Sequence, residues 1–342
     1  MKILSEFSKN KRKIVLGVIV LLLVLSVLSG GRALWIFAHE KSSSVKTVAF
    51  LMASDISEEK IDGVKQGMNR YGFIEGENVN FITENAHGDN LLLPKLAQQL
   101  IKAQPDVIVV TGDDEATAAK NTLSNQKIPI VFVGVGSPVD LGLVNDLLLP
   151  GGNVTGVENC TVQLSGKRLE YFKRLLPRLN KVTVLYDPAA ENSLKSLPYL
   201  EEVAGKLQLK IVPAAVTSSS EVVQELQKID PEAGNGAMLL CSILFESVVD
   251  EIKPVIYNRQ IPLMGAGEAR GVDGLFASYG MPYYQQGEQA SRLVAKVLNG
   301  DNPAFIPVES PSRVELIVNT DVINKFGLNL DSGGLSLVTQ FK

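Results

Sequence analysis

The feature that most constrains the fold is a repeated order of strand-like and helix-like segments in the two halves of the chain. In each half, an apolar β-rich run is followed by an amphipathic stretch with helical spacing and then by a second β-rich run. This alternation is typical of βαβ units, in which a helix carries the chain between parallel strands. The segments are 47–52, 58–71 and 79–85 in the first half, and 182–186, 193–207 and 210–215 in the second.

The repeat continues in the same register. Each half next contains a strand-like run, a helix, and a closing Ile-Pro followed by apolar residues. Self-similarity on this scale is the signature of a duplicated unit. We therefore predict an α/β fold of two Rossmann-like lobes, each built on a parallel sheet. The segments are 107–111, a helix from about Glu115 and 128–134, and then 237–241, a helix from about Glu246 and 261–265.

Two such lobes imply a cleft. In open parallel sheets, ligands bind at the carboxyl ends of the strands, where helix N-termini offer free N–H groups and the positive ends of their dipoles. Lobes that face each other by these edges would hold a small molecule between them and exclude water from it.

Residues 1–44 differ from the rest of the chain. A basic cluster at 9–13 precedes an uncharged apolar run at 14–28, the pattern of a secretory signal or a membrane anchor. The run has 15 residues, fewer than the ~20 that a spanning helix needs. Together with a second apolar run it could span as 14–38, whereas a site near 31–33 would suit a signal peptidase equally well. We predict export, with 1–44 as a signal peptide or as a membrane anchor with a tether.

Charge and cysteine content narrow the classes of partner. Residues 1–44 contain seven of the 33 basic and two of the 37 acidic residues, so the remainder has 26 against 35, a net charge of −9. Such an acidic body argues against nucleic acid, whose binders present a basic patch. Cys160 and Cys241, the only cysteines, each lie in an apolar context and are expected to be separate buried thiols.

Residue types that support catalysis are sparse. His39 and His87 are the only histidines, too few for a His-based metal site or a catalytic triad. The sequence contains no Walker loop and no Gly-x-Ser-x-Gly motif. We predict a protein that is not an enzyme and that uses neither a metal nor a cofactor.

Several short motifs occur in a specific order: GFIEGENV at 72–79, PIVF at 129–132, SPV at 137–139, PGGNVTGV at 150–157, VLYDP at 184–188, ASYG at 277–280, YYQQG at 283–287 and PAFIPV at 303–308. With them, the sequence from about residue 47 to residue 328 resembles the ABC transporter substrate-binding protein family whose members include tryptophan- and tyrosine-binding lipoproteins. The resemblance implies a type I periplasmic binding protein fold whose chain crosses a hinge three times, with 150–157 and 277–280 as crossings. It also implies a small-molecule solute and an ABC permease with its ATPase as partners.

The crossings divide the chain into discontinuous lobes. We expect residues 45–155 and 280–306 to form the first lobe, and residues 156–279 and 307–330 to form the second. Residues 331–342 are expected to be a C-terminal tail.

Candidate ligand contacts in the first lobe lie where strands end. Gly112 would let a ligand approach the backbone, and the N–H groups that follow it could bind a carboxylate. Asp113 and Asp114 could contact the ligand, cap the helix, or do both. Two aspartates depart from the Thr or Ser with Pro that the family usually carries here, and they would favour a ligand amine or cation. The candidate set in this lobe also includes Ser54, Gly136 and Ser137.

In the second lobe, the turn from Tyr186 to Ser193 leads into a helix. The resemblance implies that this turn contacts the polar end of the ligand, with Tyr186, Asn192 and Ser193 as candidates. Asn192 or Ser193 could equally serve as an ordinary helix cap.

Three further candidates follow from comparison with the family pattern. Leu244 lies where the family commonly has a polar residue, so it suggests an apolar wall or different local packing. Glu268 could accept an ammonium group, or it could be a solvated loop carboxylate. Tyr279 could stack on a ligand ring, or it could pack within the hinge.

Two functions fit these observations. The first is an extracytoplasmic solute-binding protein of an ABC importer that delivers an amino acid or similar small molecule to a permease. The second is a membrane-tethered sensor ectodomain that binds the same class of solute and reports to a kinase.

Overall fold

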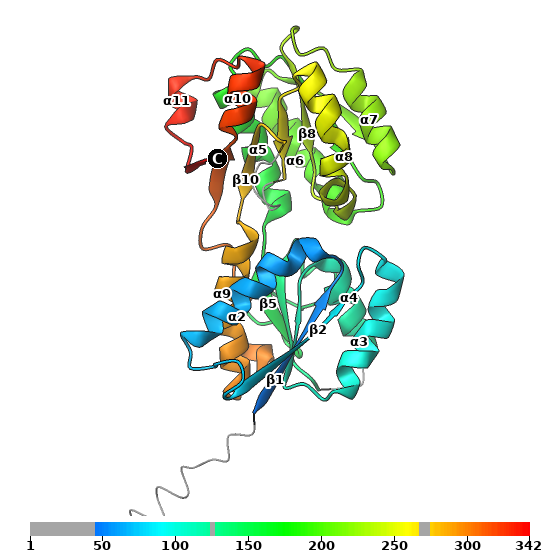
Figure 1. Ribbon diagram of the computed structural model, residues 1–342, viewed down its shortest axis with the longest axis vertical. Coiled ribbons are helices and arrows are strands. Elements are labelled where there is room, and N and C mark those ends of the chain that lie inside the picture. The colour runs from blue at the N-terminus through cyan, green and yellow to red at the C-terminus, as the bar shows by residue number, and fades with distance from the viewer. Residues whose placement is uncertain (1–44, 124–126, 267–273) are drawn as a thin grey trace, which may run out of the picture. The chain divides into compact units, whose positions relative to one another are not determined.

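The computed structural model describes residues 45–123, 127–266 and 274–342 (Figure 1). All elements below belong to the compact unit Lys46–Lys342. The predicted signal peptide or anchor at 1–44 lies outside the described residues, as does Glu268. Within the described ranges, no helix is both long enough and apolar enough to cross a membrane.

The first lobe is built on a five-stranded sheet with the order β2-β1-β3-β4-β5, in which every pairing is parallel. Its central strands are apolar at nearly every position because helices cover both faces of the sheet. The elements are β1 (Lys46–Met52), η1 (Asp55–Ser57), α2 (Glu58–Asn69), β2 (Val79–Asn85), η2 (Asn90–Leu92), α3 (Leu93–Lys102), β3 (Val107–Val110), α4 (Asp113–Thr122), β4 (Ile130–Val135), β5 (Val154–Glu158), and later α9 (Tyr283–Leu298) with η3 (Pro303–Phe305).

Alternation along β1 separates two apolar cores in this lobe. Val48 and Phe50 pack on the side of α2 and α9, whereas Ala49 and Leu51 pack on the side of α3 and α4. All four side chains are fully buried. The helices α2 and α9, far apart in sequence, therefore share one face of the sheet (Figure 1).

The second lobe is built on a seven-stranded sheet with the order β12-β11-β10-β9-β8-β6-β7. The β10–β11 pair is antiparallel and the other pairs are parallel. The prediction of two α/β lobes with mostly parallel sheets is confirmed. The elements are α5 (Thr161–Leu175), β6 (Lys181–Tyr186), α6 (Glu191–Leu207), β7 (Lys210–Ala215), α7 (Ser219–Gln227), β8 (Asn235–Leu239), α8 (Ile243–Arg259), β9 (Leu263–Gly265), β10 (Ala277–Gly280), β11 (Glu315–Val318), α10 (Thr320–Phe326), α11 (Ser332–Leu335) and β12 (Gln340–Phe341).

The C-terminal segment, expected to be a tail at 331–342, takes part in this lobe. The Asp331 amide donates to the carbonyl of Leu175 at the end of α5. Further on, β12 pairs in parallel with β11 and extends the sheet.

The chain passes between the two sheets three times: after β5, after β10 and before β11. The expected first crossing at 150–157 is placed too early, because β5 pairs with β4 along its length and belongs to the first sheet. Asn159 stays on this lobe as well, since its amide donates to Val135 O and its Nδ2 donates to Gly134 O. The chain therefore leaves the lobe at Cys160, which has a positive φ of 52°.

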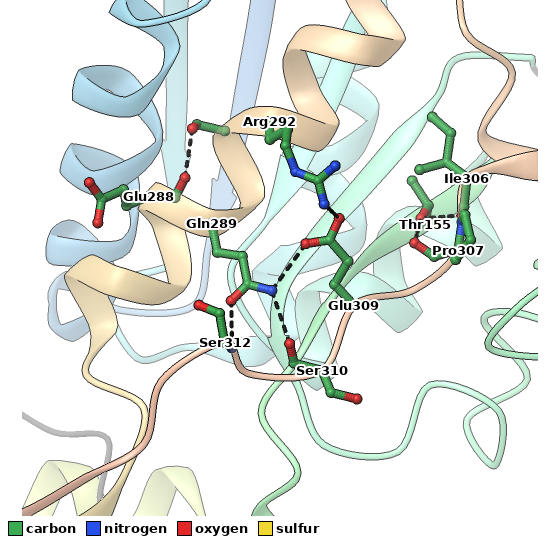
Figure 2. A network of polar contacts seen from close by, with 10 residues as sticks. Thr155, Glu288, Gln289, Arg292, Ile306, Pro307, Glu309, Ser310 and Ser312 are labelled. Atoms are coloured by element: carbon green, nitrogen blue, oxygen red, sulfur yellow. Dashed lines mark hydrogen bonds and ion pairs between the residues drawn. The ribbon is translucent and has the colours of Figure 1, made fainter.

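The third crossing is also fastened to the first lobe. The Glu309 amide donates to Gly156 O, and the Glu158 amide donates to Glu309 O, so this crossing runs beside the end of β5. Figure 2 shows the Gln289 side chain of α9 hydrogen-bonded to the same segment. Its Nε2 donates to Glu309 Oε2 at 3.0 Å and to Ser310 O at 2.9 Å, and its Oε1 accepts from the Ser312 amide at 2.9 Å.

Candidate functional site

A cavity of about 500 Å³ is lined by both lobes. Its residues follow the carboxyl ends of β1, β3, β4 and β5 in the first lobe and of β6 and β8 in the second, which is where parallel sheets bind ligands. The lining residues are Ala53, Ser54, Ser57, Lys60, Asn90, Thr111, Gly112, Asp113, Asp114, Glu115, Thr117, Gly134, Leu141 and Asn159, with Asp187, Ala189, Ala190, Glu191, Asn192, Cys241, Ser242 and Ile243.

One side chain of the second lobe reaches directly into the first. Asn192, in the first turn of α6, donates from Nδ2 to the Asp113 carboxylate and accepts at Oδ1 from Ser137 Oγ at 3.0 Å. The other Asp113 oxygen accepts from the Gly136 amide at 2.9 Å. A Cβ at Gly136 would lie only 2.2 Å from Asn192 Nδ2, so this contact requires glycine at position 136.

Burial raises the pKa of Asp113 to about 6. The Gly136 N–H bond opposes the shift, the Glu115 and Asp114 charges add to it, and the Lys60 charge opposes it.

Two carboxylates from opposite lobes repel each other at this cavity. Asp114 accepts from Asn90 Nδ2 at 2.7 Å, and its pKa is raised first by burial and then by the charge of Asp187. Asp187 is held by the Ala189 amide at 2.8 Å and by Ser242 Oγ at 2.6 Å. A cation between the two carboxylates would relieve this repulsion.

Glu115 has a structural role at the edge of the cavity. Its Oε1 accepts from the Ala53 amide and from Thr111 Oγ1, each at 2.8 Å. These bonds join the end of β1 to the end of β3 and the start of α4. The buried carboxylate thereby fixes the loops that line the first-lobe side.

Lys60 on α2 also lines the cavity, although its residue is only 4% exposed. Its Nζ donates to Thr111 O at 2.6 Å and lies 4.4 Å from the centre of the Tyr283 ring. The backbone of α9 presses against α2 here, since a Cβ at Gly287 would lie 1.9 Å from Lys60 O. Among the described residues, no group of three or more His, Cys, Asp or Glu side chains could hold a metal ion.

The structure brings together only part of the set of site residues predicted from sequence. Ser54, Gly112, Asp113, Asp114 and Asn192 line the cavity. Gly136 and Ser137 lie just behind it, bonded to Asp113 and Asn192, and Ser193 Oγ accepts from the Asp187 amide.

Three predicted residues lie elsewhere. Tyr186 packs against the core of the second lobe, and Tyr279 packs edge-on against Tyr171 with 4.8 Å between ring centres, which is hinge packing. Leu244 packs against the other core of that lobe, and its neighbour Ile243 lines the cavity instead.

Cys160 and Cys241 are not disulfide-bonded, and both are half-buried rather than buried as expected.

Capping, one of the two alternatives for the aspartates and for Asn192 or Ser193, does not occur at these helix starts. α4 begins at Asp113 after Gly112, and α6 begins at Glu191 after Ala190, and neither start has a side-chain cap. Asp113 and Asn192 are instead engaged with each other across the cavity.

Sequence reasoning missed Lys60, Asn159, Asp187 and Ser242, all of which line the cavity. A signal for Lys60 was present in the spacing. It precedes Val64 by one helical turn and so lies on the apolar stripe of α2, where a lysine is unexpected.

Two α/β lobes linked by three crossings, with a cavity at the strand ends of both, define a bilobed solute-binding protein. The chain belongs to the ABC transporter substrate binding protein family, whose model matches residues 45–340. Proteins of this family are extracytoplasmic substrate-binding components of ABC transporters and have no catalytic role. This protein is therefore a substrate-binding protein and not an enzyme.

Individual relatives agree with this assignment. The chain is 28% identical over 292 residues to a tyrosine-binding protein of Clostridioides difficile strain R20291, covering 83% of this chain and 82% of that one. It also matches the ligand-free, open structure of a Clostridium difficile substrate binding protein with adhesive properties, at 26% identity and a TM-score of 0.68, covering 87% and 99% of the two chains. A Streptococcus pneumonia ABC domain in complex with L-Trp shares the fold, at 21% identity and a TM-score of 0.77, covering 87% and 100%.

Proposed function

We propose that this protein binds a small solute with an ammonium group, foremost an amino acid, and delivers it to the permease of an ABC importer. The observation that carries the proposal is the charge of the cavity. Both lobes contribute carboxylates to its lining, and these would exclude a purely anionic molecule and attract a cationic or zwitterionic one. The acidic lining residues are Asp113, Asp114 and Glu115 of the first lobe and Asp187 and Glu191 of the second.

The volume of the cavity and the similarity to a tyrosine-binding protein both support an amino acid as the ligand. A volume of about 500 Å³ falls within the range of pockets that enclose small molecules. The relative named as a tyrosine-binding protein matches most of the chain. Asp114 and Asp187 are the natural partners of the ligand ammonium group because they come from opposite lobes and repel each other without it.

Delivery to a permease requires that the protein be exported and that its lobes close on the solute. Residues 1–44 would direct export, either as a membrane anchor or as a signal peptide that is cleaved. Contacts between the lobes, such as Asn192 with Asp113 and Lys195 with Asp140, would secure the closed state.

The test begins with mass spectrometry of solute released from natively purified protein, followed by calorimetric titration with the twenty amino acids. We expect at least one amino acid to bind and to reduce the radius of gyration in solution scattering. Binding of only anionic or uncharged solutes would overturn the proposal. Loss of solute uptake in cells that lack the gene supports transport, whereas intact uptake with a lost transcriptional response would identify a sensor.

A further inference from the structure

One cationic side chain, that of Lys60, lies among the acidic residues that line the cavity. A buried ammonium group is costly unless an anion compensates it. Lys60 is 4% exposed, yet it forms no ion pair with any residue that the structure describes. Its contacts are one backbone carbonyl, that of Thr111, and the face of the Tyr283 ring.

The carboxylates nearest in the fold are engaged elsewhere. Glu115 directs Oε1 to the Ala53 amide and the Thr111 hydroxyl. Asp113 is bonded to the Gly136 amide and to Asn192. The protein thus holds a buried cation at its binding cavity that makes no direct ion pair with a described residue, although its charge acts on the nearby Asp113 carboxylate.

Two serines line the same part of the cavity. Ser54 and Ser57 precede η1 and α2, and neither hydroxyl caps its helix. Ser57 is only 9% exposed, and within the described ranges its hydroxyl makes no hydrogen bond to the protein. Both hydroxyls can donate to an anion, and the N-terminal end of the 12-residue helix α2 favours negative charge.

We infer that Lys60, Ser54 and Ser57 form a subsite for the carboxylate of the ligand, opposite the Asp114–Asp187 pair that receives its ammonium group. This inference rests on the proposed function and makes it more specific. Carboxylates alone would suit a simple amine or polyamine. The added cation restricts the cavity to zwitterions, so an α-amino acid binds and its decarboxylated amine is rejected.

The experiment compares Lys60→Met with the parent full-length protein. The probes are each L-amino acid that binds in calorimetric titration, paired with its decarboxylated amine, such as L-tyrosine with tyramine. The parent should prefer the amino acid by about thirtyfold or more, the scale on which a desolvated charge pair acts. Lys60→Met should lose that preference while its affinity for the amine is unchanged or higher.

Two further variants separate loss of the subsite from a general loss of folding. Lys65→Met removes a lysine from the same helix that packs over Phe50 and Phe81, away from the cavity, and should leave the preference intact. Ser57→Ala tests the subsite with a minimal change and should reduce the preference several-fold. Without ligand, Lys60→Met should melt no lower than the parent, because an apolar side chain replaces an uncompensated buried charge.

The outcomes separate the two levels of the proposal. An amino acid that binds equally well to the parent and to both cavity variants overturns the carboxylate subsite alone. A parent that binds the amine as tightly as the amino acid overturns it too, and leaves an ammonium-binding receptor. Failure of every amino acid to bind the parent overturns the proposed amino-acid function and the subsite with it.

Discussion

Asn192 of α6 and Asp113 of α4 form a hydrogen bond that joins the two lobes across the binding cavity. The bond is possible because Gly136 has no side chain, which lets Asn192 reach the loop after β4. The Asp113 carboxylate at this junction is buried, and burial raises its pKa.

Gly136→Ala should hold the lobes apart without unfolding either one. The new Cβ would lie 2.2 Å from Asn192 Nδ2, well inside contact distance. We expect weaker ligand affinity and a larger radius of gyration at saturating ligand, measured by solution scattering. Gly152→Ala is the matched control because a Cβ there meets nothing within 4 Å. Identical scattering of the two variants would contradict the role of this contact.

Asp113→Asn should change how stability depends on pH. The pKa of about 6 exceeds the ordinary 3.8, so the folded state holds this proton more tightly than the unfolded chain does. Stability from this group therefore falls as pH rises from about 4 to about 6 and stays low above that range. At pH 8 the variant should be more stable than the parent by on the order of 3 kcal/mol.

Chemical denaturation across the pH range checks this expectation. The amide can keep both bonds, because Asn192 can flip to present its oxygen to the new Nδ2 while its own Nδ2 faces the Ser137 hydroxyl. A stability difference that does not vary between pH 4 and pH 7 would show that Asp113 titrates normally.

Asp187→Asn should weaken binding of an amino acid by about thirtyfold or more. The substitution removes one of the two facing carboxylates proposed to hold the ammonium group, and it keeps an oxygen for the Ala189 amide. Glu191→Gln is the control, since Glu191 also lines the cavity but pairs with Lys195 at 2.7 Å. Calorimetry should show a much smaller loss for Glu191→Gln, and equal losses would argue for a diffuse charge effect.

Gln289→Ala should loosen the third crossing. The substitution removes three hydrogen bonds to Glu309, Ser310 and Ser312, each contributing about 0.5–1.5 kcal/mol. We expect faster amide hydrogen exchange at Ser312, whose N–H donates to Gln289 Oε1. Glu288→Ala, which removes only the neighbouring ion pair with Arg70, should leave exchange in this segment unchanged.

Local patterns in the sequence were sufficient for much of the fold. The strands at 79–85 and 210–215 were predicted to the residue because β-rich runs bounded by polar turns define them locally. The position of the first crossing was not predictable in this way. It depends on the pairing of β5 with β4 and on the contact of Glu309 with β5, which join residues far apart in sequence.

The same distinction between local patterns and long-range contacts applies to the site residues. Asp113 and Asp114 follow a strand directly, so their position at the cavity could be predicted. The partner of Asp113 could not, because Asn192 is 79 residues away and looked like an ordinary cap. Lys60 was missed because a lysine on an amphipathic helix is usually solvated. Its place on the apolar stripe of α2 was a local signal, and tertiary packing shows that it is enclosed.

Hydrogen bonds hold two of the crossings to the first lobe, and this limits the conformational entropy of the unliganded protein. Asn159 and Ser312 are still bonded to that lobe, so only a few residues of the first and third crossings remain to rotate. Few freely rotating residues mean a narrow set of open arrangements and a small loss of conformational entropy when the lobes close. Ligand contacts then translate into affinity with little lost to ordering the receptor.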